Sequence, residues 1–147
     1  MIARGNHILY KQEINLGHDH LVQMIRRQYQ LGDDEAWAQL HSTDKPADFK
    51  IKVGDQFQQQ FLQEVQRFLQ FYYTTQGDHS ADVQHILICD YPNSVDISPY
   101  IAQQVNIPTQ QIYPVNTAQA GSKLDAHRLA ADAMQLTVAF GLAMRGL

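Results

Sequence analysis

The chain has little of what several classes of protein require. Only one of its 147 residues is a cysteine, Cys89, so no internal disulfide can form. No apolar run approaches the roughly 20 residues that a membrane-spanning helix needs, so we expect no direct membrane insertion. Lysine and arginine number 11 against 15 acidic residues, giving a formal net charge of -4. We therefore expect no nucleic-acid partner, because such partners select a clustered basic face.

Sequence motifs for catalysis are also missing. There is no nucleophile elbow, phosphate-binding glycine-rich loop or Cys-x-x-Cys pair, and the glycines are scattered singly. Among the seven histidines, His18 and His20 form the one closely spaced pair. A catalytic zinc site usually needs three protein ligands; His41 and His7 could assist, but nothing in the spacing requires it. We therefore predict no catalytic residues and no metal site, and interpret these histidines as surface or capping residues.

The length of the chain and its 44% hydrophobic residues are typical of one folded domain, which covers residues 1–147. Gly5-Asn6 is a turn signal and predicts a β-hairpin of Met1–Arg4 and His7–Ile14. Apolar residues at helical spacing then predict helices at about residues 18–30, 33–40 and 53–75. Asp19 is a candidate N-cap of the first helix. Residues 41–52 are rich in polar residues and proline and predict a loop.

The second half of the chain alternates between short strands and helices. Val83–Asp90 is apolar and predicts a strand buried on both faces, with Cys89 inside the core. Ile97–Val105 predicts a helix and Gln111–Val115 a second strand. The final helix, from about Asp125, has almost no polar face near its end, so we expect it to be buried, with Gly141 allowing another backbone to come close. This alternation favours an α/β layered domain.

Four segments carry motifs in a fixed order. They are the hairpin and helices of Arg4–Leu40, "FLQEVQRFLQFYYTT" at Phe61–Thr75, "VQHILICDYPN" at Val83–Asn93 and "VAFGLAMRGL" at Val138–Leu147. Together they resemble the second half of the PilM-type actin-like proteins of bacterial type IV pilus assembly. The resemblance implies an α/β fold: part of an actin-like (ribonuclease H-like) lobe, with a mixed sheet that includes the N-terminal β-hairpin and is covered by helices.

The resemblance also implies the place of a nucleotide site, and the sequence departs from the family there. Gly17-His18 stands at the family's Gly-Gly loop, Glu35 matches, and Leu40 takes the place of an adenine-side lysine. Asp90-Tyr91 replaces the adenosine-binding Gly-Gly pair, where glycine lets the backbone approach the nucleotide. Asp90 adds a negative charge and Tyr91 a large ring. We therefore expect a degenerate, inactive site and no cofactor, with ATP as a ligand only if the site is functional.

The function that this resemblance implies is a non-catalytic, cytoplasmic assembly or scaffold component of a type IV pilus machine. Accessory components of MSHA pilus biogenesis are the nearer kind, since their nucleotide motifs are also expected to be eroded. The implied partners are inner-membrane pilus assembly proteins, which could hold the protein peripherally at that membrane. Two alternatives are a divergent actin-like ATPase and a cell-division scaffold resembling FtsA, a family that normally carries a C-terminal amphipathic membrane helix.

The beginning of the sequence leads to two further expectations. Its first predicted strand starts at Met1, and the phosphate-binding half of the family is missing, so we expect a fragment of a longer protein. A hairpin that starts there would leave an unpaired strand edge. Ile8, Tyr10 and Ile14 would extend an apolar face beside that edge. We therefore expect the chain to form a homodimer through its hairpin.

Overall fold

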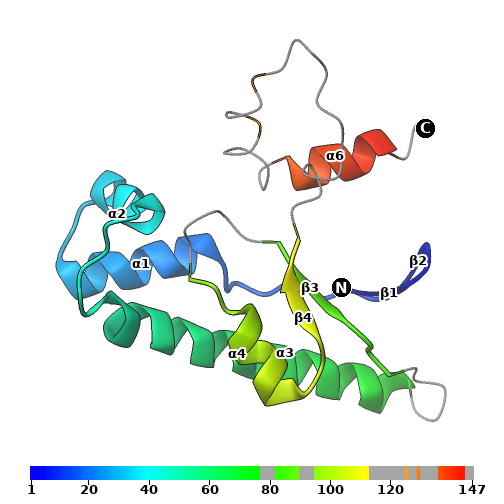
Figure 1. Ribbon diagram of the computed structural model, residues 1–147. Coiled ribbons are helices and arrows are strands. Elements are labelled where there is room, and N and C mark those ends of the chain that lie inside the picture. The colour runs from blue at the N-terminus through cyan, green and yellow to red at the C-terminus, as the bar shows by residue number, and fades with distance from the viewer. Residues whose placement is uncertain (77–81, 90–94, 113–124, 126–128, 130–135, 145–147) are drawn as a thin grey trace.

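Helices and small sheets alternate along the chain, which confirms the predicted α/β class (Figure 1). The computed structural model describes residues 1–76, 82–89, 95–112, 125, 129 and 136–144. Within these residues the strands form two separate two-stranded sheets, one antiparallel and one parallel, where the sequence predicted one mixed sheet.

The N-terminal hairpin forms as predicted but is shorter. Strand β1 (Ile2–Arg4) pairs antiparallel with β2 (His7–Tyr10). Gly5 in the turn has φ +57°, a left-handed conformation that glycine adopts without strain. The Tyr10 ring lies 4.9 Å from that of Phe68 and stacks at 5.6 Å on that of Phe71. These contacts anchor the hairpin on the long helix α3 (Asp55–Gln76). The predicted extension to Ile14 is wrong, because β2 ends at Tyr10.

Helices α1 (His18–Tyr29) and α2 (Asp33–His41) form an antiparallel pair. Gly17 is the N-cap of α1, so the assignment of that role to Asp19, which lies in the first turn, was wrong. Gln30 ends the helix in the left-handed conformation, with φ 55°. The apolar stripe of α1 faces the core through Leu21, Val22 and Ile25, each at most 3% exposed.

A π-helical turn, η1 (Lys50–Gly54), leads directly into the long helix α3 (Asp55–Gln76). The predicted loop over residues 41–52 therefore ends early, because Lys50 already lies in η1. Phe49, Val53 and Phe57 recur every fourth residue and are at most 5% exposed, so burial of this stripe drives the early start. The outer side of α3 is polar, with Gln59, Gln63, Gln66 and Gln70 exposed as predicted.

The parallel sheet follows α3. Strand β3 (Ile86–Ile88) pairs with β4 (Thr109–Gln111), and helix α4 (Ser98–Val105) connects them. A strand buried on both faces was predicted here, and this was wrong: Ile88 is 8% exposed, but Leu87 on the opposite face is 54% exposed. Cys89 is also exposed, contrary to its predicted burial. Strand β4 begins at Thr109, earlier than predicted, and residues 113–115 of the predicted strand lie outside the described part.

The closing helix differs most from its prediction. Helix α6 (Thr137–Met144) has no buried residue, and Val138 and Leu142 are 73% and 61% exposed. A Cβ on Gly141 would have nothing within 4 Å, so no backbone among the described residues approaches it. The expected burial of this helix and the expected close approach of a backbone at Gly141 are therefore wrong. Residues 145–147, the last three of the "VAFGLAMRGL" motif, lie outside the residues that the structure describes.

One hydrophobic core joins α1, α2, η1, α3 and α4. Leu40, Val53 and Ile101 are completely buried at its centre. Ile88 brings one face of the parallel sheet into the same cluster. Among the residues that the structure describes, no helix combines the length and apolar character needed to cross a bilayer.

Candidate functional site

Gly17 and His18, two of the residues predicted to lie at the nucleotide site, begin helix α1. Gly17 is extended, with φ -164°, a conformation open to any residue. A Cβ at Gly17 would meet nothing within 4 Å. The glycine therefore serves neither a strained turn nor a close backbone approach. His18 is half-buried as the first residue of the helix.

His18 lies near the C-terminal end of α2, because α1 and α2 are antiparallel. His41, the last residue of α2, stacks on Trp37 with 5.7 Å between ring centroids. Burial lowers the pKa of His41, and the positive charges of His18 and Lys45 lower it further. This end of the helix pair thus gathers His18, His41 and Lys45, of which only His18 was predicted to belong to the site.

Glu35 lies at the other end of the helix pair. Its Oε2 accepts a hydrogen bond of 2.9 Å from the backbone N–H of Gly32, the N-cap of α2. An ion pair of 2.8 Å between Arg26 and Asp33 holds this end of α2 against the last turn of α1. Glu35 is therefore separated from His18 by most of the length of α1. Its carboxylate stabilises its own helix, as a carboxylate in a first turn does.

Leu40 faces the core. Its side chain is 0% exposed and belongs to the cluster formed by α1 and η1. No atom of Leu40 can reach a ligand at the surface without repacking that core. Leu40, which stands where the family has an adenine-side lysine, therefore belongs to the hydrophobic core here.

Lys45 closes the C-terminal end of α2. Its Nζ donates to the carbonyl oxygens of Leu40 at 3.0 Å and Ser42 at 2.6 Å, and lies 5.4 Å from the centre of the Phe49 ring. Burial lowers the pKa of this ammonium group. Cations at a helix C-terminus satisfy free carbonyls and the helix dipole. The charge of Lys45 therefore has a structural use.

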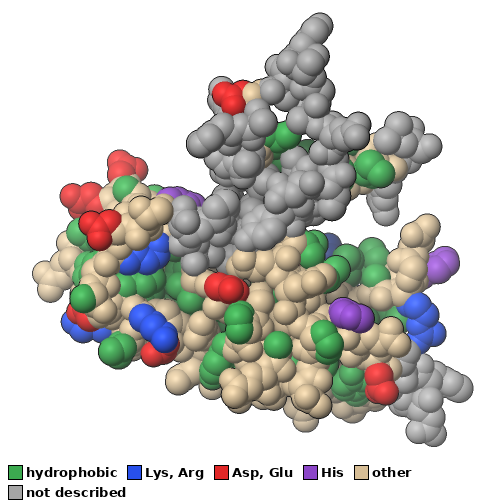
Figure 2. Space-filling view, viewed as in Figure 1, with side chains coloured by type: hydrophobic (Ala, Val, Ile, Leu, Met, Phe, Trp, Pro, Cys, Tyr) green, Lys and Arg blue, Asp and Glu red, His purple; other side chains and the backbone are tan. Residues whose placement is uncertain are grey.

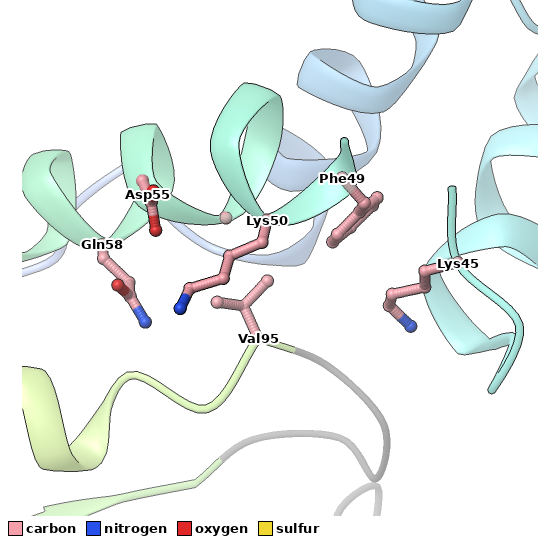
Figure 3. Close-up of a pocket in the computed structure, with 7 residues that line it drawn as sticks. Lys45, Phe49, Lys50, Asp55, Gln58 and Val95 are labelled. Carbon is pink, nitrogen blue, oxygen red and sulfur yellow. The ribbon is translucent and has the colours of Figure 1, made fainter. Parts of the chain in front are cut away.

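A shallow pocket of about 160 Å³ lies between the start of α3 and Val95 (Figure 3). Lys45 and Lys50 supply positive charge, while Asp55 supplies negative charge at the same pocket. Pockets for drug-sized ligands and cofactors usually hold about 300–1,000 Å³. The pocket therefore suits a ligand smaller than a nucleotide. Its residues were missed because Lys45 fell in a predicted loop. The four-residue spacing of Phe49, Val53 and Phe57 was the signal that could have moved the helix start forward.

The N-terminus of α4 carries a carboxylate of its own. Oδ1 of Asp96 accepts a hydrogen bond of 3.0 Å from the N–H of Ser98, and the backbone carbonyl of Asp96 accepts one from Gln58 at 3.1 Å. A free helix N-terminus attracts anions, and Asp96 supplies one internally. Asp90 and Tyr91, which precede this helix, lie outside the described residues.

The six predicted site residues thus do not assemble into one site as far as they are described. Gly17 and His18 begin α1, Glu35 caps the far end of α2, and Leu40 is in the core. Among the described residues, no three His, Cys, Asp or Glu side chains are grouped as a metal site would require.

The architecture defines an α/β domain in which a hairpin, a helix pair, a long helix and a β-α-β unit follow one another. This is the class that the actin-like resemblance implies. Residues 1–147 match the family described as Type IV pilus assembly protein PilM. The chain therefore belongs to this family, and its role lies in type IV pilus assembly.

Proposed function

We propose that this protein is a non-catalytic scaffold component of a type IV pilus assembly machine, with a nucleotide site that no longer works. The observation that carries this proposal is the burial of Leu40, which is 0% exposed at the position of the expected adenine-side lysine. A side chain committed to the core cannot contact adenine. A scaffold needs only the fold and its surfaces, so such a replacement does not impair it.

Other residues support the same proposal. The Glu35 carboxylate is engaged by the Gly32 N–H, and Asp96 places a negative charge at the N-terminus of α4. In the sequence, Asp90 and Tyr91 replace glycines, which adds charge and bulk where a nucleotide would need close backbone approach. The negative charge of Asp90 and the ring of Tyr91 therefore weaken the binding expected for an anionic nucleotide.

A nucleotide titration tests this directly. A fluorescent ATP analogue and ATP itself are titrated against the wild-type chain, and phosphate release is followed in parallel. We expect neither saturable binding nor phosphate release above a protein-free blank. The matched variant is Asp90→Gly combined with Tyr91→Gly, which restores the family's glycines. Saturable micromolar binding by the wild-type chain would contradict the proposal and favour a divergent ATPase.

We propose further that the machine this protein serves is an MSHA-like pilus system. We propose a cytoplasmic protein that reaches the inner membrane peripherally, through membrane-anchored assembly proteins. What supports this is the family membership together with the eroded nucleotide motifs. Co-purification from cells should recover inner-membrane pilus proteins. Recovery of cell-division proteins instead would favour the FtsA-like alternative.

A further inference from the structure

The outer face of α3 is uncharged over most of its length. Glutamine is the commonest residue type of the chain, at 20 of 147. Between residues 56 and 74 the only charged residues are Glu64 and Arg67, and these pair with each other. Figure 2 shows few charged side chains on the visible surface over α3 and α4. Exposed helix faces in globular proteins carry charged or polar residues, and on this face nearly all of them are neutral amides.

The exposed residues of this face follow the spacing of a helix–helix seam. They are separated alternately by four and three residues, and all are exposed: Gln56, Gln60, Gln63, Arg67, Gln70 and Thr74. This alternation is the heptad spacing at which one helix contacts another along its length. The stripe lies opposite the buried stripe of α3, and within it Gln60 is hydrogen-bonded to His20 of α1 at 2.7 Å.

A hollow lies at one end of this seam. Its volume is about 190 Å³, and it is lined by Arg67, Gln70, Phe71 and Thr74. These four residues stand at positions i, i+3, i+4 and i+7. In knobs-into-holes packing, four residues of one helix surround one side chain of its partner. Phe71 is 54% exposed and gives the hollow an apolar wall.

We propose that this face binds the same face of a second copy of the chain, with the two α3 helices antiparallel about a two-fold axis at Gln63. Gln63 lies seven residues after Gln56 and seven before Gln70. At about 1.5 Å rise per residue, an axis at Gln63 places Gln56 of each copy about 10 Å away, over the hollow of the other. Each copy then supplies one knob and one hole.

The neutrality of this face suits a second copy as the occupant. The chain carries a formal net charge of -4, so two copies repel each other where charged surfaces meet and least where neutral surfaces meet. An amide both donates and accepts hydrogen bonds, so a glutamine face is complementary to itself. In the antiparallel arrangement Arg67 faces Gln59 of the partner, and Glu64, one residue from the axis, is paired with Arg67 of its own chain. This contact goes beyond the proposed role in pilus assembly and is independent of the nucleotide site.

Sedimentation velocity over a range of protein concentrations tests the proposal. We expect the wild-type chain to pass from monomer to dimer as concentration rises. Gln63→Glu and Gln63→Lys each place two like charges at the axis and should each weaken association more than tenfold. An equimolar mixture of the two variants should restore the dimer. Gln103→Glu, an exposed change on α4, is the matched control and should associate as the wild type does.

A cross-link locates the axis independently. In a Cys89→Ser background, Gln63→Cys should form a disulfide-linked dimer on oxidation, and Gln103→Cys should not. Gln63 is exposed, so these variants should keep the wild-type unfolding midpoint. A wild-type chain that stays monomeric at every concentration overturns the proposal. So does a dimer that Tyr10→Lys abolishes and both Gln63 variants leave intact, because that result would place the contact at the hairpin.

Discussion

The hydroxyl of Tyr29 donates a hydrogen bond of 3.0 Å to Oδ1 of Asp48 and ties the end of α1 to the segment before η1. Lys52 holds the other oxygen of the same carboxylate at 2.7 Å. Tyr29 and Asp48 are 19 positions apart in the sequence, so their hydrogen bond closes a loop of the chain that contains α2.

The Tyr29–Asp48 contact should give the protein a stability that depends on pH at both extremes. Burial and the hydrogen bond to Asp48 raise the pKa of Tyr29 from 10.0 to about 12. Its contribution is complete below pH 10 and is lost as pH rises through about 12, because the folded state binds the proton more tightly. Hydrogen bonds from Lys52 and Tyr29 lower the pKa of Asp48 from 3.8. That contribution is present above pH 3.8 and is lost as pH falls through the lower, folded-state value.

The matching variant is Tyr29→Phe, which removes the hydroxyl and keeps the ring. We expect a lower unfolding midpoint at neutral pH and a smaller further loss between pH 10 and 12 than in the wild type. Thermal melts across that range measure both. Parallel alkaline losses in the two proteins would show that Tyr29 does not titrate as inferred.

Leu40 should behave as a core residue. Leu40→Ala removes a side chain that is 0% exposed, and such changes cost about 2–5 kcal/mol in free energy of unfolding. Urea unfolding measures the loss. Gln39→Ala, on the same helix and half-buried, is the control and should cost far less. Equal losses at the two positions would contradict the central place of Leu40.

Gly141 should tolerate a side chain. A Cβ there meets nothing within 4 Å, and the residue lies inside α6. Gly141→Ala should therefore stabilise this helix by up to about 1 kcal/mol, because alanine has the higher helix propensity. The helical signal in circular dichroism and the unfolding midpoint report the change. A marked fall in the midpoint would mean that another segment packs closely on Gly141.

Cys89 should react slowly with thiol reagents at neutral pH although it is exposed. Partial burial raises the pKa of its thiol above 9.0, and only the thiolate is nucleophilic. The labelling rate of the folded protein should therefore be lower at pH 7 than that of the urea-unfolded chain and should rise with pH. A native rate equal to the unfolded rate at pH 7 would contradict the raised pKa.

Much of the fold follows from local sequence. Gly5 sets the hairpin turn, and the stripe of Leu21, Val22 and Ile25 sets the buried side of α1, because both depend on nearest neighbours and helical period. The candidate site was less predictable. The resemblance proposed positions for it, but only the packing of α2 reveals that Leu40 faces the core and that Glu35 caps its own helix.

The sequence by itself determined the α/β class, the order of most elements and the family, since these depend on periodicity, turn residues and ordered motifs. Tertiary structure decided which apolar residues are buried. Leu87 and Val138 are as hydrophobic as Ile88 and Ile101, yet the first two are more than half exposed and the others buried. The reason is that hydrophobicity describes a side chain's preference, whereas burial depends on whether another element packs against it, and that contact comes from residues distant in the chain.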